Sequence, residues 1–432
     1  MFKIRKHSFL TIMVFLLLYY IYMNVIRKVM IPGSGVVVPI ILMLLTCSIF
    51  LSSKKKRLTI TGDRMVRCLS LFWMLICVVL FVNCSSLMQQ LVYGGMIQLY
   101  VMVFFLAFVK DDVWFVVWMR WMKFAGLLYA LSTIVFYFNH ALYSRFVMFF
   151  FPETSAMLEK FYKFGWMCGI CDHFSTNGMV LATAFMAVSL EILMNMKMKA
   201  SIPASSKRIL YCLAFVVLYG LVLSSKRAPL ICSFASVGMV YYISLSKRKT
   251  NAIVFFCIAT VLFFIMYEFL LPYIPGLSTI ADKFSSTSAD GDVLQGRNVL
   301  WAVAYDMISS APILGHGFGS YAAITEQMHL FTTSAHNYYL QVFAELGAIG
   351  LFLYVFVMGL GVKLTLNTIK KMSNCRVPAS WVDSFVIRFS LAFQFFVILY
   401  NLSASALMYY VILVPYFLSL TAACILSRKY ED

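Results

Sequence analysis

Charged residues are scarce in this sequence. Only 12% of its 432 residues are Asp, Glu, Lys or Arg, whereas 62% are hydrophobic. A soluble chain of this length would form several domains and carry about twice as many charges. The composition therefore excludes an ordinary soluble protein and indicates a protein that lies in a membrane.

Acidic residues are the scarcest of all, 17 against 35 Lys and Arg, which leaves a net charge of +18. A basic balance of this size can indicate a protein that binds nucleic acid. Here, however, the basic residues lie in short connections between apolar runs, where the positive-inside rule places them. We therefore predict a lipid bilayer as partner and no nucleic acid.

The apolar runs have the length that crosses a bilayer core, about 20 residues. We predict an all-α polytopic membrane protein with about twelve transmembrane helices, forming a single integral membrane domain over residues 1–432. The first run follows basic residues but no small-x-small cleavage site, so we interpret it as an uncleaved span. The predicted spans are Ser8–Ile26, Val36–Leu51, Cys68–Asn83, Leu91–Val109, Trp121–Phe138, Asn177–Met194, Ile209–Leu223, Pro229–Leu245, Ala252–Leu271, Asn337–Val362, Ser384–Tyr400 and Leu407–Leu426.

The Lys and Arg residues are distributed unevenly between the two sides of this predicted bundle. Most of the 35 lie on the side of the N-terminus. The positive-inside rule assigns that side, with both termini, to the cytoplasm. The connections that then lie outside include His140–Thr176, the turn Ser224–Arg227 and the long connection Pro272–Ala335.

The connection 272–335, between the ninth and tenth spans, is too long to be a mere link, which favours a functional role. Arg297 falls in the first turn of an amphipathic helix predicted there, on its apolar face. Pro312 ends this helix, and the glycines of segment 315–319 allow a flexible turn. The apolar face consists of Leu300, Val303, Ala304, Met307 and Ile308.

His336 opens the span that follows. Because a helix turns 100° per residue, Gly347 and Gly350 are predicted on the same face, in a groove of small residues. An imidazole titrates near neutral pH, which suits a general base. The alternative is an interfacial histidine without a catalytic role. Glu345 is predicted on the opposite face, in a hydrogen-bonded structural role.

Three cations stand on the predicted outer side, where positive charge is otherwise sparse: Lys226, Arg227 and Arg297. An arginine grips a phosphate group through two parallel hydrogen bonds. The group of cations therefore predicts an anionic ligand. The alternative is that these side chains anchor the protein at lipid headgroups.

The eleven cysteines lie mostly within apolar runs, as small buried hydrophobes do. The exception is the pair Cys168 and Cys171, with two residues between them. A lone pair of this spacing lacks the second ligand pair of a zinc site, so we predict no metal. On the outer side of a membrane, a disulfide or redox pair is the stronger alternative, and the oxidation state of the pair stays open.

Several motifs together resemble the bacterial O-antigen ligase and polymerase superfamily. The resemblance covers about residues 165–363. Its main motif is H-N-x9-G-x-x-G, formed by His336, Asn337, Gly347 and Gly350. Upstream elements of the same pattern are Arg297, Trp301, the turn Pro312–Gly319, the segment Leu223–Leu230 and, more weakly, Phe174–Gly178.

This resemblance implies an inverting glycosyltransferase of the bacterial inner membrane that needs no metal and no cofactor. The implied donor is a glycan on undecaprenyl pyrophosphate, presented at the periplasmic face, where residues 272–335 form the catalytic loop. His336 would deprotonate an acceptor hydroxyl. Arg227 and Arg297 would hold the pyrophosphate as it leaves, which fits a leaving group that needs charge stabilisation more than protonation. Lys226, Asn337 and Asn177 would add substrate contacts.

The resemblance leaves two enzymatic roles open. One is a polymerase that joins lipid-linked repeat units, and the other is a ligase that moves finished chains to lipid A-core or another acceptor. The sequence shows no large extramembrane domain for a separate acceptor, which favours the polymerase and disfavours protein O-glycosylation. Chain-length regulators or other assembly proteins are possible partners.

A transporter of lipid-linked sugar is the alternative from another class, because twelve spans with both ends inside fit it equally well. Transporters usually have two matched halves and charges near the midplane. In this sequence the halves differ in hydropathy and the polar residues gather in one outer connection, which favours the enzyme.

Overall fold

The computed structural model of this chain describes residues 112, 114–197, 204–245, 297–330, 334–375, 378–405 and 409–430. These residues form helices and turns, with no strand among them. Five of the described helices are long and apolar enough to cross a membrane. An all-helical membrane protein is thus confirmed, whereas the count of twelve spans is not. The predicted spans at residues 8–26, 36–51, 68–83, 91–109 and 252–271 lie outside the described residues.

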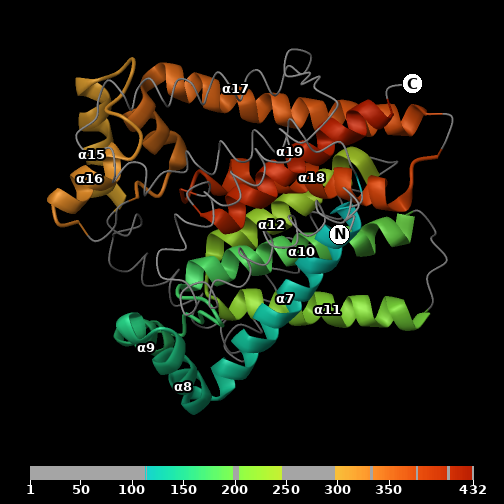
Figure 1. Cartoon of the computed structure of the whole chain (residues 1–432), viewed down its shortest axis with the longest axis horizontal. Coiled ribbons are helices and arrows are strands. Elements are labelled where there is room, and N and C mark those ends of the chain that lie inside the picture. The colour runs from blue at the N-terminus through green and yellow to red at the C-terminus, as the bar shows by residue number, and fades with distance from the viewer. Residues whose placement is uncertain are drawn as a thin grey trace, which may run out of the picture. The chain divides into compact units, whose positions relative to one another are not determined.

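The chain divides into two compact units. Among the described residues, the first unit holds residues 114–245 and 375–396, and the second holds 297–374 and 397–430. The helices of both units are labelled in Figure 1.

Three helices in mutual contact form the centre of the first unit: α7 (Trp114–Phe138), α10 (Phe174–Lys197) and α11 (Ala204–Leu223). Small residues let them approach closely. A Cβ added to Gly126 of α7 would lie 2.1 Å from the Cβ of Ala184 in α10, and one added to Gly220 of α11 would lie 2.9 Å from the Cα of Ala130 in α7. Small residues at the contact are typical of helices packed in a membrane, where van der Waals packing replaces the hydrophobic effect.

Two further helices complete the first unit. α12 (Arg227–Val240) packs against α10 and continues into a π-helical turn, η3 (Tyr241–Leu245). α18 (Trp381–Tyr400) belongs to this unit up to Phe396, and its Phe389 ring meets the Trp118 ring of α7 edge-on at 5.3 Å. Every residue from 174 to 188 is buried, as expected for a helix that is apolar all round.

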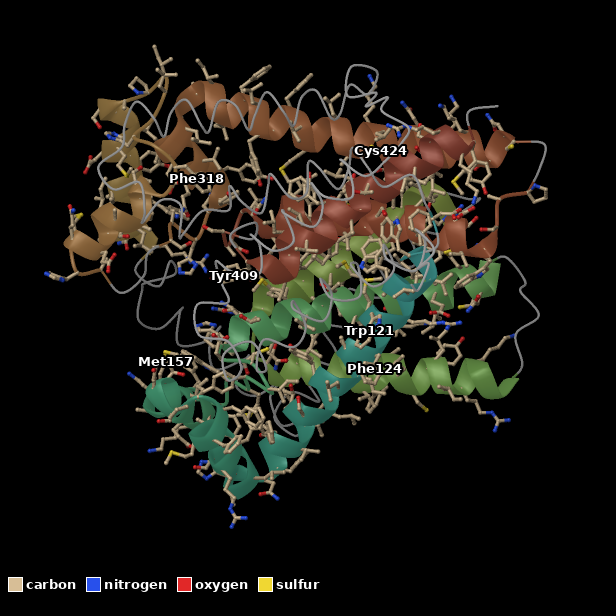
Figure 2. All side chains as sticks on the ribbon, in the orientation of Figure 1. Trp121, Phe124, Met157, Phe318, Tyr409 and Cys424 are labelled. Atoms are coloured by element: carbon tan, nitrogen blue, oxygen red, sulfur yellow. The ribbon has the colours of Figure 1, made fainter. Side chains whose placement is uncertain are left out.

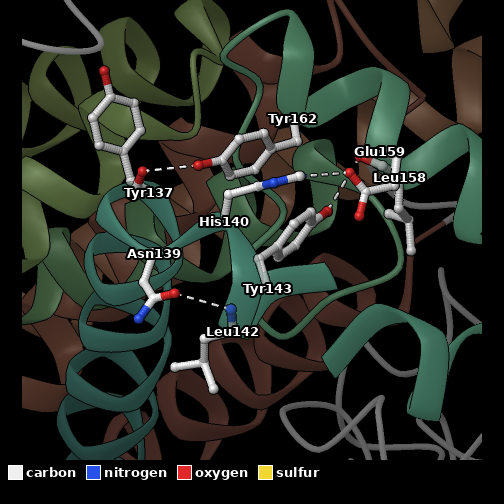
Figure 3. A network of polar contacts seen from close by, with 8 residues as sticks. All are labelled: Tyr137, Asn139, His140, Leu142, Tyr143, Leu158, Glu159 and Tyr162. Atoms are coloured by element: carbon white, nitrogen blue, oxygen red, sulfur yellow. Dashed lines mark hydrogen bonds and ion pairs between the residues drawn. The ribbon is translucent and has the colours of Figure 1, made fainter. Parts of the chain in front are cut away.

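The connection between α7 and α10 folds into a helical hairpin, which the sequence analysis treated as a plain connection. It consists of α8 (His140–Phe150), the 3-10 turn η2 (Pro152–Thr154) and α9 (Ser155–Lys163). Asn139 caps α8 by accepting a hydrogen bond from the Leu142 amide at 3.0 Å. Tyr143 stacks on Tyr162 with ring centroids 5.1 Å apart (Figure 3). Met157 lies on the exposed side of α9 (Figure 2).

The second unit is organised around one long helix, α17, which packs against the other helices of the unit and bonds to the end of α18 through the Tyr339 hydroxyl, which donates to the Ile398 carbonyl at 3.0 Å. Its helices are α15 (Arg297–Ser310), α16 (Ser320–Gln327), α17 (Tyr338–Asn374) and α19 (Tyr410–Lys429). A helix, α15, is observed where the amphipathic helix was predicted. Its predicted apolar face is buried at Leu300, Val303, Ala304 and Met307, and it ends at Ser310, ahead of Pro312.

Seven predicted spans correspond to described helices, and two of them differ by about seven residues or more at one end. α7 begins at Trp114 rather than Trp121, and Lys123, near the predicted start, pairs inside the unit with Glu191 of α10 at 2.8 Å. α17 continues to Asn374, well past the predicted end at Val362.

Candidate functional site

His336 lies immediately before α17 rather than within it. Its backbone is in the left-handed region, with φ of 52°, and its amide donates to the Ser334 hydroxyl at 3.3 Å. Left-handed backbone is uncommon for a residue with a Cβ, and it persists where the surroundings fix it. The surroundings here include Asn401, whose carbonyl accepts a hydrogen bond from the Tyr338 amide at 2.8 Å. The structure therefore holds His336 at the head of α17 in a defined turn.

Asn337 is the N-cap of α17. Its side-chain oxygen accepts a hydrogen bond from the Leu340 amide at 3.2 Å, and its carbonyl accepts one from the Gln341 amide at 3.0 Å. A cap satisfies amides that lack a partner inside the helix. This observed role starts the helix directly after His336, while the predicted substrate contact of Asn337 stays a prediction.

Arg297 belongs to the same unit as His336, and one side chain links their two segments. Trp301 lies one helical turn after Arg297 in α15, and its indole N–H donates to the carbonyl of Ala335 at 3.0 Å. Because residues four apart share a helix face, Arg297 lies on the face of α15 that meets the residue preceding His336. Two predicted site residues are thus brought to adjoining segments. Trp301 was part of the sequence motif, but its hydrogen bond was not predicted.

The glycine turn after α15 docks into a break in α17. Gly347 has φ of 65° and ψ of −169°, so the helix is interrupted there. The amides of His316 and Gly317 donate to the carbonyls of Ala344 and Glu345 at 3.2 and 2.8 Å, and the Ala348 amide donates to Pro312 at 2.9 Å. The turn thus satisfies the backbone groups that the break releases, as helix interruptions in membranes require.

This break corrects the predicted geometry of the span. The helix-face argument placed His336, Gly347 and Gly350 on one face of an uninterrupted helix, but His336 precedes the helix and Gly347 breaks it. The backbone is approached closely at Gly347, because an added Cβ would lie 2.1 Å from the Ile313 carbonyl oxygen. What approaches is the chain's own turn.

Lys226 and Arg227 belong to the first unit. Arg227 is the first residue of α12, and Lys226 is its N-cap. The turn before them is fixed by Ser225, which has φ of 54° and donates its hydroxyl to Gly165 at 2.9 Å. The Lys226 ammonium lies 4.9 Å from the centre of the Phe174 ring, a cation–π contact. The predicted tight turn between two helices is thus present, and both cations are partly buried.

Asn177 is fully buried in the first unit. Its amide donates to the Thr133 hydroxyl of α7 at 2.9 Å and to the Met167 carbonyl at 3.0 Å. These bonds tie the segment before α10 to α7. The position favours a structural role over the predicted substrate contact.

The cysteine pair lies in the same segment, and both thiols are free and buried. The Cys168 thiol donates to the Trp166 carbonyl at 3.7 Å. Burial raises the pKa of both thiols well above the usual value, so neither is a ready thiolate. In this geometry the pair resembles buried structural cysteines more than a redox pair.

His173, next to this pair, titrates far from neutrality. Burial, and secondly the charge of Lys226, lower its pKa to about 4, against the opposing effect of Asp172. Its Nδ1 accepts a hydrogen bond from the Ser175 amide at 3.0 Å. A neutral His173 thus caps the start of α10.

The comparison with protein families bears on the second half of the chain. Residues 212–355 match the family described as O-Antigen ligase. The matched range runs from α11 into α17 and includes five of the predicted site residues: Lys226, Arg227, Arg297, His336 and Asn337. No curated protein matches the chain. The match supports a membrane glycosyltransferase activity of this general type and a role in polysaccharide biosynthesis. Over residues 212–355 the chain is thus similar to the O-antigen ligase and polymerase superfamily, as its motifs predicted.

Proposed function

We propose that this chain is an inverting, metal-independent glycosyltransferase that joins the repeat units of a bacterial surface polysaccharide, an O-antigen or a capsule. Its proposed donor is a glycan on undecaprenyl pyrophosphate. The observation that carries this proposal is the placement of His336. It is held in a left-handed turn at the head of α17, and the preceding carbonyl is bound by Trp301, one turn from Arg297.

In the proposed reaction, His336 accepts the proton of an acceptor hydroxyl as its oxygen attacks the anomeric carbon of the donor. The bond from that carbon to the pyrophosphate oxygen breaks with inversion, and the lipid pyrophosphate leaves with the electron pair. Arg297 and Arg227 stabilise the negative charge that develops there. The proton on His336 then passes to solvent, which restores the base.

The proposed setting is the bacterial inner membrane, with both termini in the cytoplasm and the site at the periplasmic face. This orientation rests on the distribution of Lys and Arg. It places α15, α16 and the head of α17 on the side where lipid-linked glycans are presented. Chain-length regulators or other assembly proteins are proposed partners there.

A ligase is the second candidate, because the matched family is described as O-Antigen ligase. Donor and chemistry would be the same, and the acceptor would be lipid A-core or another lipid. We favour the polymerase because the sequence shows no large extramembrane domain for a separate acceptor.

A glycan gel of a gene-deletion strain tests the proposal. The strain receives back either the wild-type gene or His336→Ala, and surface polysaccharide is compared with lipid-linked intermediates. Single repeat units in place of a ladder, in both the deletion and the variant, are expected for a polymerase. Long chains that stay on undecaprenyl pyrophosphate would indicate the ligase. Intermediates trapped on the cytoplasmic leaflet would indicate a transporter and overturn the catalytic role.

The phosphate contacts have their own test. Arg297→Lys and Arg227→Lys keep the charge but lose the planar two-pronged hydrogen bonding of the guanidinium. We expect each to lower glycan transfer by about tenfold or more, corresponding to loss of one charge-assisted hydrogen bond. Full transfer in both variants would contradict pyrophosphate binding by these arginines.

A further inference from the structure

A buried chain of polar side chains starts at the turn that carries His336. The Ser334 hydroxyl accepts the His336 amide at 3.3 Å and shares a hydrogen bond with the Ser405 hydroxyl at 2.7 Å. Ser405 lies 71 residues further along the chain, after α18, and is 2% exposed. Its proton is donated to the Gln341 side-chain oxygen at 2.7 Å. The turn is thus connected to the first helical turn of α17 through a residue from another segment.

The chain ends at Glu345, which is 1% exposed. The Gln341 amide donates to its Oε1 at 3.1 Å. The backbone N–H groups of Gly319 and Tyr321, at the start of α16, face this carboxyl group. Two residues later, Gly347 breaks α17. One acidic side chain therefore contacts both the polar chain that leads to His336 and the start of α16 beyond the glycine turn.

Such a network is costly to bury, since each group must find its partners to offset its desolvation. An apolar side chain at position 345 would fill the space without that cost, which is why a buried acid in a membrane helix indicates a specific demand. The contacts indicate what this network does. Its hydrogen bonds fix the turn that precedes α17 relative to α15 and α16.

We propose that Glu345 is a positioning residue for His336, acting through Gln341, Ser405 and Ser334. The proposal rests on the proposed role of His336 as base. Glu345 itself does not touch substrate. It fixes the left-handed turn so that the imidazole stays at the head of α17, next to the segment that α15 holds through Trp301.

The hydrogen-bond directions provide a decisive variant. In the exchange Gln341→Glu with Glu345→Gln, the carboxylate at 341 accepts from Ser405 and from the amide at 345. The side-chain oxygen at 345 still faces the backbone N–H groups of α16. The exchange keeps an acceptor opposite every donor, whereas Gln341→Glu alone sets two carboxylates against each other and Glu345→Gln alone places an N–H group opposite one of the donors. The exchange therefore tests the network and not the residue type.

The experiment uses the full chain in lipid nanodiscs, with lipid-linked glycan extracted from cells that lack the gene. Glu345→Gln and Ser405→Ala should lower kcat by about tenfold to a hundredfold, as expected for a misplaced catalytic group, with KM little changed. The exchange variant should restore most of the lost rate. Ser419→Ala is the matched control, because Ser419 is equally buried in this unit but donates only within α19, to Tyr416.

A second measurement needs no donor. Diethyl pyrocarbonate modifies accessible imidazoles, and mass spectrometry of the peptide that carries His336 gives the rate. Glu345→Gln and Ser405→Ala should change this rate at unchanged melting temperature, and the exchange variant and Ser419→Ala should not. Wild-type kcat and modification rates in Glu345→Gln and Ser405→Ala would overturn the inference. So would a loss of rate that follows only the melting temperature. If instead His336→Ala transferred glycan normally, the proposed function would fail, while the modification rates would still report whether Glu345 positions His336.

Discussion

Two connections between long helices fold into pairs of short helices, and they are held in different ways. The α8–α9 hairpin is held by side chains: Tyr143 stacks on Tyr162, and Phe161 packs on Trp166 at 5.8 Å. The α15–α16 segment is held through its backbone, which bonds to the broken turn of α17.

The two segments should differ in how well they tolerate substitutions. Packed rings adapt to a changed neighbour by small rotations, so the hairpin should lose stability gradually. A backbone docked on backbone has no such freedom, because Gly315 and Gly347 both have positive φ and face each other's segments at contact distance. The candidate base lies beside the second kind of segment, which is the one able to hold a fixed geometry.

Gly347→Ala should show the largest effect and separates the two kinds of support. The added Cβ would lie 2.1 Å from the Ile313 carbonyl oxygen, at φ of 65°. We expect at least about 3 kcal/mol of lost stability and loss of glycan transfer. Gly359→Ala is the control in the same helix, because nothing lies within 4 Å of its added Cβ. Thermal unfolding in detergent measures both, and equal melting temperatures would refute rigid backbone docking.

The second-largest effect is expected on acidification, which should lower the stability of the region next to the α8–α9 hairpin through His173. The pKa of His173 is about 4 in the folded state and about 6.5 when unfolded. Below pH 6.5 the unfolded state binds the extra proton, so stability is full above that pH and falls by on the order of 2–3 kcal/mol toward pH 4. His173→Asn keeps an acceptor for the Ser175 amide and should flatten this dependence between pH 4 and 6.5. A pH profile unchanged by the substitution would exclude His173 as its source.

Two hydrogen bonds of equal length, one in each unit, allow a direct comparison of the α15–α16 segment with the α8–α9 hairpin. Trp301 donates to Ala335 in the second unit, and Tyr162 donates to Tyr137 in the first, both at 3.0 Å (Figure 3 shows the latter). Trp301→Phe and Tyr162→Phe should each cost about 1 kcal/mol in unfolding free energy. Only Trp301→Phe should also lower glycan transfer, by roughly tenfold. Equal activity in the two variants would show that α15 does not support His336.

The smallest effect is expected at the surface of the hairpin. His140 and Glu159 pair at 2.8 Å, with His140 52% exposed (Figure 3). Exposed pairs contribute at most about 1 kcal/mol, because solvent screens them. His140→Gln should therefore leave the melting temperature nearly unchanged and glycan transfer intact. A large loss of transfer would assign the hairpin a direct part in the reaction.

The sequence predicted the elements whose cause is local. Hydropathy located α10, α11, α12 and α19 within a few residues, because the bilayer selects apolar runs of one length. The helical spacing of apolar residues predicted α15, and Pro312 predicted its end. The helices α8 and α9 escaped prediction because each is too short to be recognised as a membrane span, and their apolar faces pack on rings from neighbouring segments.

The candidate site, too, could be predicted from the sequence only where its residues form a local pattern. His336, Arg297 and the glycine turn carry a recognisable motif. The partnership of Ser334 with Ser405 leaves no such signal, because it joins residues far apart in sequence.

By itself, the sequence determined that this chain lies in a membrane, where its long helices run and which few polar residues are available for chemistry. The tertiary structure alone decided that α17 breaks at Gly347 and that His336 stands before the helix in a left-handed turn. The physical reason is that hydropathy and periodicity act on each segment separately. A helix break in an apolar setting is stable only when another segment supplies its missing backbone partners.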